Sequence, residues 1–209
     1  MSDYLNKTEE QQFEEAKSWF KENGTPIVVA IFLVAVATFG WNYWQKHQIE
    51  VAQTTSASYQ QVMESYLQNP EKNAPLIQKF IAENKDSSYA VFAQLEEAKQ
   101  AADKGDFATT KTLLTQALGS TTDATLQNVI RFRLATVDYQ LKEFDAALAT
   151  LSQIKDTAWD FRKQLLTGDL LAAKGDKAAA KSAYEQAKEK AGDANQMLQM
   201  LIDVRLNNL

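Results

Sequence analysis

The sequence predicts an all-α protein in which one membrane-spanning helix precedes a solenoid of helical hairpins. Three observations lead to this prediction. Residues 26–44 form an uncharged, mostly apolar run in a chain that is otherwise rich in charged residues. From residue 46 onward Ala, Leu, Gln, Lys and Glu dominate, and these residues favour helices over strands. Short breakers divide this second part into segments of helical-hairpin length, and some of them recur at a similar spacing.

Residues 1–24 are predicted to form a short cytoplasmic tail that contains an amphipathic helix. Apolar side chains recur in it at intervals of three and four residues: Phe13, Ala16, Trp19 and Phe20. We expect Trp19 and Phe20 to lie at the membrane surface. Asn23-Gly24 is predicted to end this helix, since glycine suits the left-handed position after a helix, and Thr25-Pro26 to start the next one.

Residues 25–45 are predicted to be a transmembrane anchor in contact with the bilayer through residues 26–44. At about 1.5 Å per residue this run spans roughly 28 Å, close to the hydrocarbon thickness of a bilayer. It ends in three aromatic residues that favour the membrane interface: Trp41, Tyr43 and Trp44. The mixed-charge residues in front of it argue against a cleaved signal peptide. The alternative, a buried helix of a soluble core, seldom needs so long a run that is apolar on all faces.

The lysines around the anchor predict its orientation. Lys7, Lys17 and Lys21 precede the span, whereas Lys46 and His47 follow it closely. Basic residues stay on the cytoplasmic side, so we expect a cytoplasmic N-terminus and an exported C-terminal domain.

The composition argues against most kinds of catalytic, metal and nucleotide site. The chain has no cysteine and one histidine, so thiol catalysis, disulfides, a histidine triad and the common zinc sites are not expected. Its net charge of −5 offers no basic field for nucleic acid. There is no glycine-rich phosphate loop, and the many carboxylates are interleaved with lysines, as on solvated helix faces. We therefore expect no enzyme activity, no cofactor, no metal and no small-molecule substrate.

Residues 46–209 are predicted to form one solenoid domain. Because only Gly40 weakens a helix between Pro26 and Pro70, the anchor helix is expected to continue to about Gln68. The breakers that follow are Asn69-Pro70, Asp86 to Ser88, Lys104 to Asp106, Gly119 to Thr122, Lys155 to Ala158, Lys174 to Asp176 and Gly192-Asp193.

Three of the hairpins are in repeat register. The turns KGDF at 104, LKEF at 141 and KGDK at 174 are separated by 37 and 33 residues, near the tetratricopeptide period of about 34. Seven positions before the turn glycine, or its equivalent Lys142, each repeat has a small residue that lets paired helices approach: Ala98, Ala135 and Gly168.

This pattern resembles the tetratricopeptide repeat family, although the family's usual tryptophan and proline are missing from their positions. We place repeats near 90–118, 127–155 and 160–190, a degenerate first hairpin at 53–84, and a capping helix at 193–209. The resemblance implies a concave protein-binding groove lined by the first helix of each repeat. Its candidate residues are Phe92, Leu95, Lys99, Phe132, Tyr139, Arg162 and Leu165.

The combination of segments resembles one family over nearly the whole chain. The segments EEAKSWFKENG, GWNYWQKHQ, SASYQ, AENKDSSYAVFAQLEEAKQ, IRFRLATVDYQ and MLQMLIDVRLNNL are similar to those of the YfgM family. This resemblance implies a single-pass protein of the bacterial inner membrane whose C-terminal domain is periplasmic. It also implies an ancillary subunit of the Sec translocon that works with a PpiD-like periplasmic chaperone.

Two functions follow as hypotheses. In the first, a non-enzymatic membrane-anchored adaptor holds a chaperone or an emerging exported chain near the translocon. In the second, a signalling or stress-response element binds a regulator through its cytoplasmic tail, as Phe13, Trp19 and Phe20 on an acidic segment would allow.

Overall fold

The computed structural model describes residues 8–191 and 196–209, and this part of the chain is built from helices without a strand. The all-α prediction is therefore confirmed. The chain consists of two compact units, Met1–Thr54 and Thr55–Leu209. Helix α1 (Glu9–Gln68) supplies nearly all of the first unit and the opening segment of the second.

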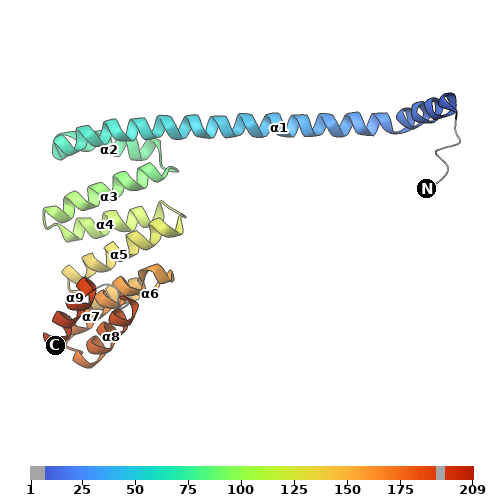
Figure 1. Cartoon of the computed structure of the whole chain (residues 1–209). Helices are drawn as coiled ribbons and strands as arrows, with labels where there is room; N and C mark the ends of the chain where they lie inside the picture. The colour runs from blue at the N-terminus through green and yellow to red at the C-terminus, as the bar shows by residue number, and fades with distance from the viewer. Residues whose placement is uncertain (1–7, 192–195) are drawn as a thin grey trace. The chain divides into compact units, whose positions relative to one another are not determined.

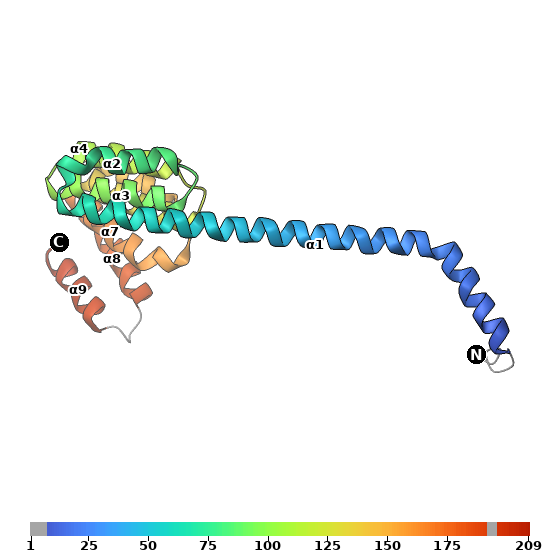
Figure 2. The same cartoon turned by 90° about the horizontal axis from the view of Figure 1, so that it is seen from above.

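In the first unit, α1 includes a segment long and apolar enough to cross a membrane, and none of that segment is buried. Its side chains from Ile27 to Phe39 are largely exposed, as a lipid-facing helix requires. The predicted break at Asn23-Gly24 is wrong, because α1 continues through Gly24 and Pro26. Gly24 does not take the left-handed conformation that would end a helix. A proline inside a helix removes one helix hydrogen bond and kinks the helix, and α1 bends in its blue part (Figure 2).

The second unit is a stack of helical hairpins (Figure 1). After α1 the order is α2 (Pro70–Glu83), α3 (Ser88–Asp103), α4 (Phe107–Gly119), α5 (Ala124–Gln140), α6 (Phe144–Ser152), a 3₁₀ turn η2 (Thr157–Trp159), α7 (Asp160–Lys174), α8 (Lys177–Ala191) and α9 (Gln196–Asn207). The breakers lie at the boundaries of these helices, and α1 ends at Gln68 as expected. The predicted break at Gly192-Asp193 lies outside the described residues.

Side-chain caps fix where several helices begin. Asn69, Ser87, Asp106 and Asp123 each accept a hydrogen bond from a backbone N–H in the first turn of the helix that follows. Such a cap stabilises a helix by about 1 kcal/mol. The short polar residues between the apolar stretches therefore set the hairpin lengths.

One turn geometry closes the first helix of each repeat. Gly105, Lys142 and Gly175 have φ of 77°, 61° and 87°. In each case the N–H of this residue and that of the next one bond back to carbonyls of the last helical turn, at distances of 2.8 to 3.0 Å. This pair of hydrogen bonds is the Schellman motif, which satisfies carbonyl groups that a helix end leaves without a partner. Lys142 thus occupies a position that the neighbouring repeats give to glycine.

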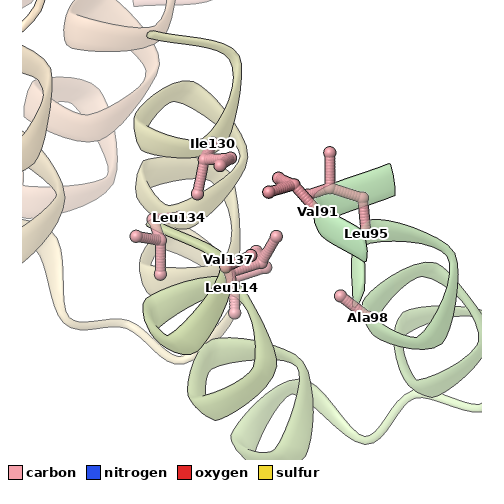
Figure 3. Close-up of a cluster of buried hydrophobic side chains, with 8 residues drawn as sticks. Val91, Leu95, Ala98, Leu114, Ile130, Leu134 and Val137 are labelled. Atoms are coloured by element: carbon pink, nitrogen blue, oxygen red, sulfur yellow. The ribbon is translucent and has the colours of Figure 1, made fainter. Parts of the chain in front are cut away.

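Buried apolar clusters hold successive hairpins together. The cluster between α3, α4 and α5 includes Val91, Leu95, Leu114, Ile130 and Val137. Figure 3 shows Val91 and Leu95 pointing toward Ile130 and Val137. Further clusters join α5, α6 and α7, and then α7, α8 and α9. Each hairpin thus buries its apolar surface against its neighbours, as in other repeat proteins.

The two ends of the stack are covered by other helices. At the start, Met63 and Tyr66 of α1 share a cluster with Ile77 and Phe80 of α2. At the end, Ile202 of α9 is fully buried in the cluster that it shares with α8. Helix α9 therefore covers the apolar surface that the last hairpin would otherwise expose.

Candidate protein-binding groove

A pocket of about 440 Å³ opens between helices α3, α4 and α5. Its walls are almost entirely apolar. Helix α3 contributes Leu95, Ala98, Lys99 and Ala102, α4 contributes Thr110 and Leu114, and α5 contributes Phe132, Arg133, Thr136 and Val137.

Small side chains create the hollow. Ala98 and Ala102 lie one helical turn apart on α3, and neither fills the space that a leucine would fill. Leu95 and Val137 form part of the buried core beneath, so the pocket wall is anchored in the cluster that joins the two hairpins. The hollow is therefore built from well-packed helices rather than from loops.

The two hydroxyl groups in the pocket already have acceptors. Thr110 donates to the carbonyl of Asp106 at 2.7 Å, and Thr136 donates to the carbonyl of Phe132 at 2.9 Å. Each threonine therefore leaves mainly its methyl group for a ligand. The pocket can bind an apolar side chain without leaving a buried polar group unpaired.

The charged residues that line the pocket are both cations. Lys99 on α3 is exposed, and its ammonium lies 3.3 Å from the carboxylate of Glu96 on the same helix. Arg133 on α5 is exposed and makes no ion pair with any described residue. The groove rim is thus positive in a chain with net charge −5.

The structure brings three of the seven predicted groove residues together. Leu95, Lys99 and Phe132 line the same pocket. Phe92 instead packs with Tyr59 and Tyr89, with ring centroids 6.5 and 6.1 Å apart.

The other three predicted groove residues contact their own repeats. Tyr139 lies 6.0 Å from Phe144 between ring centroids, and Leu165 packs in the cluster of α7, α8 and α9. The Arg162 guanidinium lies 5.8 Å from the ring centroid of Trp159, within cation–π distance.

The sequence did not single out Arg133 and Ala102 as groove residues. Arg133 is one position beyond the expected inward-facing Phe132, so a wider helical stripe on α5 would have included it. Ala102 lies three residues after Lys99, and the same periodicity would have found it. Thr110 and Leu114 come from α4, the second helix of the repeat, whereas the predicted groove was lined by first helices.

The predicted membrane-interface residues lie in the first unit and are exposed there. Trp19 contacts Phe20 edge to face, with ring centroids 5.3 Å apart. Trp41 and Trp44 are also 5.3 Å apart and tilted, with Tyr43 between them in sequence. Tryptophan and tyrosine side chains favour the headgroup region of a bilayer.

The described residues contain no group of three or more His, Cys, Asp or Glu that could hold a metal ion. On α3, outside the lining of this pocket, burial raises the pKa of the Glu97 carboxyl, and a hydrogen bond from Gln78 at 2.6 Å opposes this shift. The described features of the pocket are its shape, its apolar surface and the two cations at its rim.

A membrane-length apolar helix together with stacked hairpins defines a membrane-anchored protein of the tetratricopeptide-like class. Residues 17–209 match the family described as Tetratricopeptide repeat-like domain. The chain is 42% identical to the ancillary SecYEG translocon subunit of Haemophilus influenzae, with 96% of this chain and 97% of that protein covered. It is 37% identical to the protein of the same name from Escherichia coli K12, with 98% of each covered. The chain therefore belongs to the family of ancillary SecYEG translocon subunits.

A solved structure shares the fold. MamA 41-end from Desulfovibrio magneticus RS-1 is similar with a TM-score of 0.54 and 16% identity, over 73% of this chain and 86% of that one. At this identity the similarity concerns the fold alone.

Proposed function

We propose that this protein is a non-enzymatic adaptor of the Sec translocon. In this proposal the apolar part of α1 anchors it in the inner membrane, and the solenoid binds proteins that act on exported chains. The main support is that the identity to ancillary SecYEG translocon subunits covers 96 to 98% of the chain. The relatives therefore share both the anchor and the solenoid, which an adaptor needs together.

The groove supports a binding function. Tetratricopeptide-like solenoids bind protein segments along their helices, and a pocket with apolar walls accepts the anchor residue of such a segment. The partner that we propose is a periplasmic chaperone of the PpiD kind, or the exported chain itself. This proposal requires the orientation that the lysines predict, with the solenoid on the periplasmic side.

Confinement to the membrane explains how a small pocket would suffice. A groove held near the translocon exit meets its partner at a high effective concentration, because both are restricted to one membrane region. Weak contacts with one or two anchor residues can then give useful occupancy. The adaptor would release its partner quickly as the exported chain moves on.

Photo-crosslinking in intact cells tests the proposal. A photoreactive residue at Thr136 would report on the groove, and the same residue at Thr112, on the exposed face of α4, is the matched control. Both threonines are exposed and donate to the carbonyl four residues earlier. We expect products with a periplasmic chaperone or an exported chain from position 136 alone. Translocon subunits are expected in the same mild-detergent eluate, and their absence together with a silent position 136 would refute the adaptor.

Two further variants test the orientation and the alternative function. A reporter that is active only after export, fused behind Leu209, is expected to be active. Deletion of residues 2–22 is expected to leave translocon association intact. If this deletion abolished the binding of a regulator while translocon association stayed intact, the result would favour a signalling element that acts through its tail.

A further inference from the structure

We infer that the pocket between α3, α4 and α5 selects a large aromatic side chain that is flanked by acidic residues. This inference depends on the proposed binding function and names the class of segment that the groove takes. The occupant is a protein segment with one aromatic anchor and at least one neighbouring Asp or Glu. Three features support it: the size of the pocket, its mostly apolar lining and the two cations at its rim.

The size and lining of the pocket favour a large aromatic anchor. A volume of about 440 Å³ exceeds what a short aliphatic side chain can fill, and a partly filled hollow forgoes part of the contact energy. An aromatic ring buries roughly 150–250 Å² on its own. Phe132 and Leu95 supply a ring and an aliphatic surface against which such a ring can pack. Because both threonine hydroxyls donate to their own helices, a polar anchor would find few partners.

The rim charges determine the flanking residues. Lys99 is on α3 and Arg133 is on α5, and both helices line the pocket, so a segment seated in it passes close to two cations. No acidic residue lines the pocket. Arg133 has no carboxylate partner among the described residues, so an incoming carboxylate can pair with it without breaking an existing ion pair. Lys99 shares its charge with Glu96, and we expect it to contribute less.

This arrangement differs from simple attraction of acidic proteins to a basic surface. The chain carries net charge −5, so its overall field repels acidic partners. A preference for acidic flanks must therefore come from the two rim cations and act at short range. The preference is also linked to the anchor, because only a segment seated in the pocket brings its neighbours to both cations.

Binding of three labelled peptides to the full-length protein in detergent tests the inference. The peptides are GSGDWDGSG, GSGKWKGSG and GSGDADGSG, each carrying the same fluorophore, and the readout is fluorescence anisotropy. We expect the first peptide to bind at least about fivefold more tightly than each of the other two. The advantage over the lysine peptide is expected to shrink as salt is added, because exposed charges are screened.

Two pairs of variants separate the anchor from the flanks. Thr136→Phe fills the pocket and is expected to weaken binding of the first peptide at least about tenfold. Thr112→Phe on the exposed face of α4 is expected to leave the affinity for this peptide unchanged. The double variant Lys99→Glu with Arg133→Glu is expected to reverse the preference between the acidic and basic peptides. Its matched control, Lys177→Glu with Lys181→Glu on α8, changes two exposed lysines away from the pocket and is expected to keep the preference.

The possible outcomes separate this inference from the proposed function. Equal binding of the acidic and basic peptides, a preference that survives charge reversal at Lys99 and Arg133, or no binding of any peptide would each overturn the inference. The adaptor function is judged by the crosslinks to a chaperone or exported chain in cells and by the translocon subunits in the same eluate. Those crosslinks can persist when the peptide preference is absent, so either proposal can fail alone.

Discussion

Gly168 on α7 lies directly against the ring of Tyr184 on α8. A Cβ at position 168 would lie 2.9 Å from Cζ of that ring and closer still to Cδ1 and Cε1. Tyr184 is almost fully buried, and its hydroxyl donates to Asp169 at 2.8 Å, so the ring has little freedom to move away. The last repeat therefore depends on glycine at a position where the other two repeats have alanine.

We predict that Gly168→Ala destabilises the solenoid. Alanine normally favours a helix over glycine by about 1 kcal/mol, but overpacking of a filled interior costs about 1–3 kcal/mol. The clash is expected to make the net change in stability unfavourable, because it involves ring atoms rather than the end of a flexible side chain. Urea unfolding followed by circular dichroism measures the effect. Gly119→Ala, where a Cβ meets only open space, is the control and is expected to be neutral or stabilising; equal behaviour of both variants would contradict the prediction.

We predict that Lys142→Gly stabilises the protein by about 1 kcal/mol, because a left-handed conformation costs a residue with a Cβ about that much. The hydrogen bonds of the turn are made by backbone atoms and are kept in the variant. The comparison is Gly175→Ala, which places a Cβ at the same type of turn and is expected to lower stability by a similar amount. A shift of both variants in the same direction on urea unfolding would refute this account.

Much of the solenoid could be predicted because its signals are local. Asp106 and Asp123 cap helices, and Gly105 and Gly175 end them, so short stretches of sequence set the hairpin boundaries. Aligning the turn motifs also matched Lys142 to the turn glycines, and Lys142 has the positive φ of that position. The helix through Pro26 was not predicted, because a Thr-Pro pair after Asn-Gly resembles a helix start, whereas a long apolar helix tolerates one lost hydrogen bond.

The groove was harder to predict than the fold. The repeat register assigned Leu95, Lys99 and Phe132 to a groove, and in the structure these three residues line one pocket. It could not show that Tyr139 and Leu165, at inward positions, are occupied in packing against Phe144 and the C-terminal helices. That difference depends on which neighbouring side chains fill each gap, and a periodic pattern contains no such information.

We predict that Lys111→Met destabilises the protein much more than removal of a surface ion pair. The Lys111 ammonium lies 2.8 Å from Asp138, whose side chain is 4% exposed, and also pairs with Glu143. Its loss leaves the buried Asp138 carboxylate without a cation, which we expect to cost about 2 kcal/mol because Lys111 itself is partly exposed.

Lys79→Met, which removes an exposed pair with Glu83, is the control for this prediction and is expected to change stability by less than about 0.5 kcal/mol. The double variant Lys111→Met with Asp138→Asn is expected to recover part of the loss, because the buried charge is gone. Urea midpoints for the parent, the two single variants at positions 111 and 138, and the double variant form a mutant cycle. Equal losses for Lys111→Met and Lys79→Met would show that Asp138 needs no cation.

We predict that Tyr184 contributes stability that is lost at alkaline pH. Burial raises the pKa of the Tyr184 hydroxyl, and its hydrogen bond to Asp169 raises it further. Because the pKa is raised in the folded state, the neutral phenol favours folding below the unfolded pKa of about 10, and this contribution fades as the pH rises above that value. The pKa of Lys111 is raised by Asp138 and Glu143, so the charged ammonium adds a loss of the same sign above its ordinary pKa of 10.5.

Tyr184→Phe separates these two contributions. At neutral pH the variant loses the hydrogen bond to Asp169 and is expected to be less stable by about 1–2 kcal/mol. Between about pH 10 and 11.5 its stability is expected to fall less steeply than that of the parent, by up to about 1.4 kcal/mol per pH unit, since one titrating group is gone. Urea midpoints across this range test the slope, with Tyr43→Phe in the first unit as the control. If Tyr184→Phe and the parent lost stability in parallel, the alkaline loss would have to come from other groups.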